Sequence, residues 1–239
     1  MDQINKSAVV EGQAVSAEEL ALINRQSLRV LSAEDVFLFR LAACDNQVDR
    51  ENERFTEAAL AGLAKRFVGR PVICDHIWSA AKQAARVYAA AVEDCGGGKQ
   101  RLVLRCYMLR GEATQPMIDA IEGGILRECS VGVAIARALC SVCGADKAKT
   151  RCEHRPGQAY EGQTCHVDLD GAEDAYEVSF VAVPAQPAAG VVKAYGGEAA
   201  DPSPAEEGDR NLLTLRGRIM AARVKAVKAH NAEREERKE

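Results

Sequence analysis

The chain has 239 residues, of which 47% are hydrophobic and 28% charged, and these values are ordinary for a globular protein. Its net charge is -4, but residues 210–239 carry five net positive charges, so that residues 1–209 carry nine net negative charges. No apolar run reaches the roughly 18 residues that span a bilayer, and the first residues lack a signal-peptide pattern. We therefore expect a cytosolic protein with no membrane partner, whose nine cysteines are buried or bind metal rather than form disulfides.

Hydrophobic periodicity predicts about seven short strands and two helices in the body of the chain, preceded by one helix. In chain order the expected elements are a helix at 17–31, a strand at 36–41, a helix at 57–67, strands at 71–74, 85–92 and 101–109, a helix at 115–121, and strands at 129–138, 176–183 and 191–195. Few strands are linked by helices in a regular β-α-β order. The pattern therefore favours an α+β protein, mainly β, with a mainly antiparallel sheet or barrel and helices packed outside it.

The ends of the chain differ from this body. Residues 197–209 are rich in Gly, Ala, Pro, Glu and Asp, which is typical of a linker. A narrow apolar stripe then runs among basic residues and predicts a helical tail with its own partner. We expect an N-terminal arm at 1–32, one domain at 33–197, and a linker with a basic helical tail at 198–239.

Residues 129–138 alternate strictly, as in a half-buried strand. One face carries Cys129, Val131, Val133 and Ile135, and the other carries Ser130, Gly132, Ala134 and Ala136. The small residues leave room for something to lie against the face of Ser130. Close packing of another element on a Gly and Ala surface would explain the same pattern.

A base and an acid accompany Ser130 in two other strand-like segments. His76 follows the strand at 71–74, and Glu177 opens an apolar run. A hydroxyl, an imidazole and a carboxylate are the parts of a serine hydrolase, in which the imidazole takes the hydroxyl proton and the acid orients the imidazole. On this interpretation Glu177 receives the imidazole N–H of His76. Alternatively, His76 is an ordinary loop histidine and Glu177 an exposed charge at a strand end.

Potential metal ligands follow the Ser130 strand in a Cys-x-x-Cys pair and a Cys-x-His pair. The residues are Cys140, Cys143, Cys152 and His154. This set supplies four soft ligands at zinc-like spacing, and it predicts a small zinc-knuckle insertion at 140–156. Four protein ligands close the coordination shell, so we expect a structural zinc and no cofactor for catalysis. The alternatives are a flexible loop with free thiols, or a site in which Cys165-His166 replaces one ligand.

Several short blocks between Val36 and Tyr195 share the pattern of one protein family. They are Asp49-Arg50, Arg54-Phe55-Thr56, Gly69-Arg70-Pro71-Val72 with Asp75-His76, Glu128-Cys129-Ser130-Val131-Gly132, and the stretch from Tyr176 to Pro187. In these blocks, over about two thirds of its length, the chain resembles the prohead maturation proteases of tailed phages, which are related in fold to the herpesvirus assemblins. The last block is the most specific.

The resemblance implies a serine endopeptidase on a herpesvirus-protease-like antiparallel β-barrel ringed by helices, with Ser130 as nucleophile and His76 as general base. In assemblins the third member is a second histidine that opens the strand that Glu177 opens here, and a carboxylate can do the same job. Assemblins also use a basic pair near the oxyanion, where this chain has Ala185-Gln186 and no arginine.

The resemblance also implies partners and a place of action. The substrates would be the scaffold protein, the major capsid protein and the chain itself, cut in its linker. The enzyme would work as a homodimer inside the assembling prohead, in the cytoplasm of the host cell. The main alternative is a non-enzymatic, zinc-containing capsid assembly or scaffold module. Nucleic-acid binding is disfavoured by the acidic body and by an aromatic content of only 5%.

Overall fold

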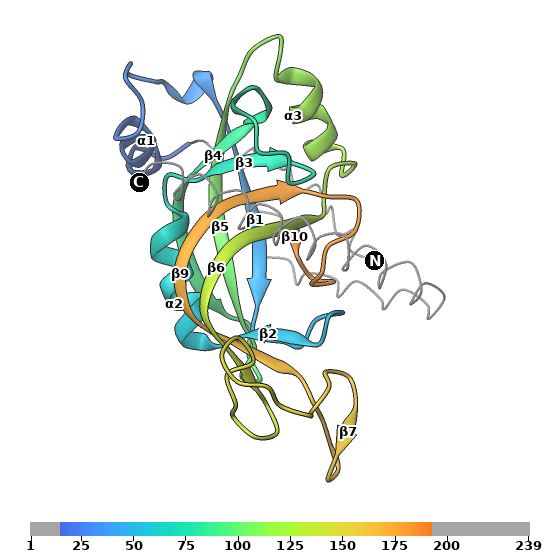
Figure 1. Cartoon of the computed structure of the whole chain (residues 1–239). Helices are drawn as coiled ribbons and strands as arrows, with labels where there is room; N and C mark the ends of the chain where they lie inside the picture. The colour runs from blue at the N-terminus through green and yellow to red at the C-terminus, as the bar shows by residue number, and fades with distance from the viewer. Residues whose placement is uncertain (1–14, 193–239) are drawn as a thin grey trace, which may run out of the picture. The chain divides into compact units, whose positions relative to one another are not determined.

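The computed structural model describes residues 15–192, a mixed α+β protein with one large sheet and few helices (Figure 1). The helices are α1 (Ala17–Asn24), α2 (Glu57–Phe67) and α3 (Gln115–Glu122), with short 3-10 turns η1 (Ala33–Asp35) and η2 (Ala80–Lys82). The strands are β1 (Val36–Asp45), β2 (Glu53–Phe55), β3 (Pro71–Cys74), β4 (Ala85–Asp94), β5 (Gln100–Leu109), β6 (Cys129–Cys140), β7 (Ala159–Tyr160), β8 (Gln163–Thr164), β9 (Val167–Phe180) and β10 (Gly190–Val192). The expected linker and basic tail at 198–239 lie outside the described residues.

The large sheet has the strand order β10-β1-β5-β4-β3-β9-β2, with β6 paired along β9. Most neighbours are antiparallel, as expected, but β2 and β3 each run parallel to β9. β2 pairs with residues 167–169 and β3 with residues 178–180, so both lie along the same neighbour. The two parallel pairs arise because the chain runs from β2 through α2 to β3, so that both strands point in the direction of β9.

The helix α2 lies against β9 and is tied to it by its N-cap residue, Thr56 (Figure 1). The hydroxyl of Thr56 accepts a hydrogen bond from Ala59 N at 3.1 Å, which caps the helix, and donates to Asp170 Oδ1 at 2.7 Å. A Cβ atom at Gly62 would lie only 2.9 Å from the Cβ of Ala172. Glycine therefore allows the helix to approach the strand closely, and the apolar face of α2 enters the main core.

The first helix is shorter than the expected span of 17–31. It ends at Asn24, whose side-chain amide binds the backbone of Leu31 in both directions, at 2.7 and 3.0 Å. These two bonds satisfy the Leu31 backbone outside a helix. Ile23 and Leu31 are both buried in a second, smaller apolar cluster with Tyr88 and Tyr107. The part of the predicted arm that the structure describes is thus docked on β4 and β5.

The two faces of β6 and β9 have different environments. The pairs Cys129–Phe180 and Val131–Val178 belong to the main core, whereas the pairs Ser130–Ser179 and Gly132–Glu177 lie on the opposite face. The predicted alternation along β6 is therefore confirmed. A buried serine and a buried glutamate on the face away from the main core require polar partners, because burying them unpaired is costly.

Candidate active site and metal centre

His76 lies in a strained turn that follows β3. Asp75 and His76 both have φ of 54°, in the left-handed region that residues with a side chain rarely adopt. The strand β9 holds this turn in place. Asp75 N–H donates to Phe180 O at 2.9 Å, and His76 N–H donates to the hydroxyl of Ser179 at 3.1 Å. Left-handed residues cost about 1–2 kcal/mol each, so these bonds offset a real penalty to direct His76 back toward β9.

The His76 ring and Glu177 form a direct contact. His76 Nδ1 lies 2.7 Å from Glu177 Oε1, and the other carboxylate oxygen accepts a hydrogen bond of 2.6 Å from Ser179 Oγ. Because an ionised carboxylate only accepts, this arrangement favours the tautomer with the proton on Nδ1. Glu177 is 2% exposed, whereas the side chain of His76 is 21% exposed. The acid is therefore sequestered, and Nε2 of the ring remains available for chemistry.

Ser130 lies beside this pair on the same face of the sheet. It is paired directly with Ser179, and side chains in such pairs lie about 5 Å apart. Ser130 is partly exposed. Within residues 15–192 no hydrogen bond joins Ser130 to His76, although such bonds are often long before substrate binds. The structure thus brings His76 and Glu177 into contact and places Ser130 on the neighbouring strand.

Two residues that complete the arrangement are Ser179 and Gly132, and neither was predicted as part of the site. Ser179 is fully buried and joins the backbone of His76 to the carboxylate of Glu177. A Cβ atom at Gly132 would collide with Glu177 Oε1 and lie 3.2 Å from Cδ. The room that the small residues of β6 leave is therefore occupied by the glutamate side chain. The available signal was the serine two residues after Glu177, on the same strand face.

The predicted metal ligands gather in one place. Ligand atoms of Cys140, Cys143, Cys152 and His154 all lie within 4.8 Å of one another, so this cluster could hold a metal ion. Cys140 ends β6, and the turn that follows is closed by a 2.8 Å hydrogen bond from Gly144 N to Cys140 O. Gly144 has φ of 72°, a conformation that favours glycine. The turn presents both cysteines of the Cys-x-x-Cys pair to the cluster.

The donor set fits a bound cation. His154 Nδ1 is buried without a hydrogen-bond partner among the described residues, and the ring of Tyr160 packs edge-on against the imidazole at 4.7 Å. Burial opposes ionisation of Cys140, but hydrogen bonds from the backbone N–H groups of Cys143 and Val142 and from the thiols of Cys152 and Cys143 together lower its pKa to about 6. A thiolate and an unpartnered imidazole nitrogen are the forms that bind zinc.

The alternative ligands Cys165 and His166 lie near the cluster but outside this set of four. Cys165 Sγ is 3.9 Å from Cys140 Sγ, and Cys165 is fully buried. His166 contacts Asp168 instead, with Nε2 3.3 Å from the carboxylate. The four ligands predicted first are therefore the ones that the structure brings together.

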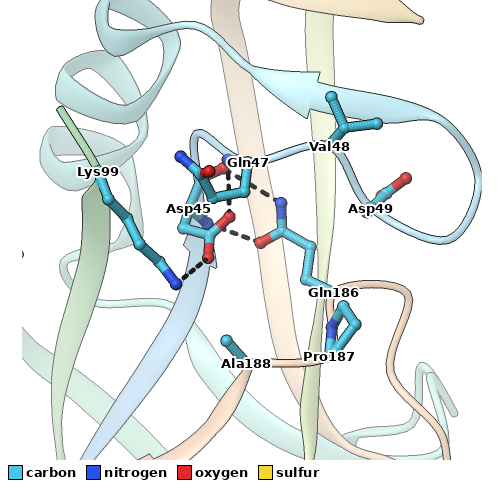
Figure 2. Close-up of a pocket in the computed structure, with 8 residues that line it drawn as sticks. All are labelled: Asp45, Gln47, Val48, Asp49, Lys99, Gln186, Pro187 and Ala188. Atoms are coloured by element: carbon cyan, nitrogen blue, oxygen red, sulfur yellow. Dashed lines mark hydrogen bonds and ion pairs between the residues drawn. The ribbon is translucent and has the colours of Figure 1, made fainter. Parts of the chain in front are cut away.

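A separate hollow of about 190 Å³ lies where the segment after β9 meets the end of β1 (Figure 2). Ligand pockets usually measure about 300 Å³ or more. The side chain of Gln186 fills one wall, where it accepts from Asp45 N at 2.6 Å and donates to Asp45 O at 3.1 Å (Figure 2). Arg50 binds the same segment, with Nη1 2.9 Å from Pro184 O. These contacts anchor residues 184–188 and give the hollow a structural role.

Carboxylates in and after the loop between β1 and β2 have raised pKa values. Burial raises the pKa of Glu53 to about 7, and the negative charges of Asp49 and Glu51 add to the effect. Burial also raises the pKa of Asp49, against the hydrogen bonds that it accepts from Glu53 N and Glu51 N. The folded chain therefore carries a carboxyl group that changes charge near neutral pH.

Comparisons with protein-family models, with curated proteins and with solved structures return no match. Among the helices of residues 15–192, none combines the length and the apolar character that a membrane crossing needs. Function is therefore inferred from the geometry of the chain itself.

Proposed function

We propose that the chain is a serine endopeptidase in which Ser130 is the nucleophile, His76 the general base and Glu177 the orienting acid. The observation that carries the proposal is the hydrogen-bonded group of His76, Ser179 and Glu177 on the strand face that Ser130 shares. A fully structural histidine needs neither a buried carboxylate on Nδ1 nor a strained turn to direct it. Backbone strain of this kind is concentrated at functional sites.

The mechanism follows from the roles of these atoms. His76 Nε2 takes the proton of the Ser130 hydroxyl as Oγ attacks the carbonyl carbon of a peptide bond. The imidazolium that forms is stabilised by Glu177, which is already in contact with Nδ1. His76 then gives the proton to the leaving amine, and an acyl-enzyme remains on Ser130. Water, activated by the same imidazole, attacks the ester and releases the acid, which restores Ser130.

More broadly, we propose that the enzyme is a prohead maturation protease with a herpesvirus-protease-like barrel. One observation supports a barrel: Glu128, just before β6, forms a bridge with Gly190 of β10, the strand at the other end of the sheet. Val191 N donates to Arg127 O at 2.7 Å beside this bridge. The proposed substrates are scaffold and major capsid proteins inside the prohead, handled by a homodimer. Self-cleavage would fall in residues 197–209, outside the described part of the chain.

For the cluster of Cys140, Cys143, Cys152 and His154 we propose a structural zinc ion. Three thiolates and one imidazole form a closed tetrahedral set, which leaves no position for substrate. The cluster joins the end of β6 to the turn before β7, and in the described part of the chain neither apolar cluster includes a residue from 140–165. The ion would therefore act in stability and would take no part in the peptidase step.

Digestion of a peptide library derived from a denatured proteome tests the proposal, because the assay requires no knowledge of the natural substrate. The full-length chain and its Ser130→Ala variant are incubated with the library, and new termini are counted by mass spectrometry. We expect new termini with the wild type and none with the variant. Equal numbers of new termini in both samples, or none in either, would contradict the proposed peptidase activity and would favour a non-enzymatic assembly module.

A further inference from the structure

Two aromatic residues that neighbour the proposed catalytic residues in the chain contact each other. The rings of Trp78 and Tyr176 contact each other with centroids 5.4 Å apart and an angle of 49° between their planes. Trp78 is 66% exposed and Tyr176 is 40% exposed. Trp78 is the only tryptophan of the chain. Ile77, which lies between His76 and Trp78 in the chain, is also exposed and apolar.

A β-bulge places Tyr176 on this side of the sheet. The pairing of β6 with β9 steps from Gly132–Glu177 to Val133–Ala175, so that Tyr176 has no partner on β6. Ala175 and Val178 both lie in the main core. The two residues between them, Tyr176 and Glu177, are therefore both turned away from it. Regular alternation would have directed Tyr176 into the core, and bulges of this type re-aim side chains next to active sites.

The turn that carries His76 places Trp78 in the same region. Trp78 follows His76 by two residues, and the turn is tied to β9 through Ser179 and Phe180. Each ring of the pair is therefore close in the chain to one proposed catalytic residue. Trp78 follows His76 by two residues, and Tyr176 directly precedes Glu177. The two contacts, ring to ring and imidazole to carboxylate, join the same turn to the same strand.

We propose that Trp78 and Tyr176 form the subsite that receives a large apolar side chain of the peptide substrate, next to the scissile bond. This inference rests on the proposed peptidase function. An extended peptide advances about 3.3 Å per residue, so a carbonyl at Ser130 brings the flanking side chains within reach of residues around His76. Two exposed rings and Ile77 offer apolar surface without a formal charge. Covering them with an aliphatic or aromatic side chain removes apolar area from water on both partners.

The experiment measures substrate preference and the reactivity of Ser130 separately. Wild type, Trp78→Ala, Tyr176→Ala and Trp78→Phe digest the same peptide library, and each is also labelled with a small fluorophosphonate that has no peptide part. Leu28→Ala is the matched control, because Leu28 is an exposed apolar residue in the segment between α1 and β1. The alanine variants should cleave about tenfold to a hundredfold more slowly and lose the preference for a large apolar residue at one position. Trp78→Phe should retain most of it.

The labelling rate should remain near the wild-type value in all of these variants. If wild type cleaves the library but Trp78→Ala and Tyr176→Ala keep its rate and its preference, the subsite is wrong while the peptidase stands. If the alanine variants lose phosphonate labelling as well as cleavage, the rings support the catalytic group rather than bind substrate, which also overturns the subsite. If wild type reacts with neither peptide nor phosphonate, the proposed function fails and the subsite fails with it.

Discussion

The substitution Gly132→Ala tests whether the neighbouring strand β6 restricts the position of the Glu177 carboxylate. The added Cβ would collide with Glu177 Oε1 and lie 3.2 Å from Cδ, so the carboxylate has to retreat by about 1 Å to reach ordinary contact distance. A retreat of that size lengthens the 2.7 Å contact with His76 Nδ1 beyond the roughly 3.2 Å limit of a hydrogen bond. Glu177 is 2% exposed, so it has little room to recover a partner in solvent.

The expected result separates activity from stability. In serine proteases, loss of the acid that sets the histidine tautomer lowers the rate by about 10⁴-fold, and we expect a loss on the order of 10³–10⁴-fold in fluorophosphonate labelling. Replacing a strand glycine by alanine stabilises by about 0.5–1 kcal/mol, and the loss of one hydrogen bond to a charged group costs about 1.5–3 kcal/mol. The free energy of unfolding should therefore fall by only about 0.5–2.5 kcal/mol.

The assay is the rate of phosphonate addition by intact mass, together with the free energy of unfolding in urea. Gly111→Ala is the control, because the nearest atom to its added Cβ is 3.9 Å away, and it should label at the wild-type rate. The double variant Gly132→Ala, Glu177→Asp provides a second check. The shorter acid makes room for the methyl group, so the losses in labelling rate caused by the two substitutions should not add. Labelling of Gly132→Ala at the wild-type rate would refute the claim that β6 restricts the position of the Glu177 carboxylate.

Three further outcomes are expected. Ser179→Ala removes a donor to the Glu177 carboxylate, worth about 1.5–3 kcal/mol, and should slow phosphonate labelling at least about tenfold; an unchanged rate would remove Ser179 from the site. Between pH 4.5 and 7 folded Glu53 binds more protons than unfolded Glu53, so stability falls as pH rises. Glu53→Gln should thus raise the unfolding free energy at pH 8 by at most about 3 kcal/mol and leave it unchanged at pH 4, whereas an equal gain at both pH values would contradict the raised pKa. Elemental analysis should find one zinc per chain that Cys143→Ser loses, and chelation should lower the melting temperature of wild type but not of that variant.

Much of the local structure could be predicted because its cause is local. Thr56 and the apolar spacing after it define α2, and strict alternation defines β6. The spacing of the cysteines with His154 also predicted the four residues that gather in the cluster. In each case one periodic pattern or one spacing contains the information, without a distant partner.

The strand β9 shows what could not be predicted. It was expected to begin at residue 176, but it begins at Val167, because acidic residues before Tyr176 are paired with arginines from distant segments. Asp168 binds Arg54, Asp170 binds Arg137, and Asp174 binds Arg70. Closely spaced aspartates predict a loop as long as the arginines that pair with them are unknown. Gly132 and Ser179 were missed for the same reason, since their roles depend on Glu177 across the sheet and on His76 in another turn.

Mapping the site of covalent reaction with a fluorophosphonate tests most directly whether Ser130 is a nucleophile that His76 activates. Such probes react with a serine whose proton is removed by a neighbouring base, and an ordinary strand serine stays unmodified. The full-length wild type should gain one adduct, mapped by peptide mass spectrometry to Ser130, while Ser130→Ala and His76→Ala fold and gain none. An unmodified wild type, or an adduct at Ser130 that persists in His76→Ala, would contradict the assignment of these two residues.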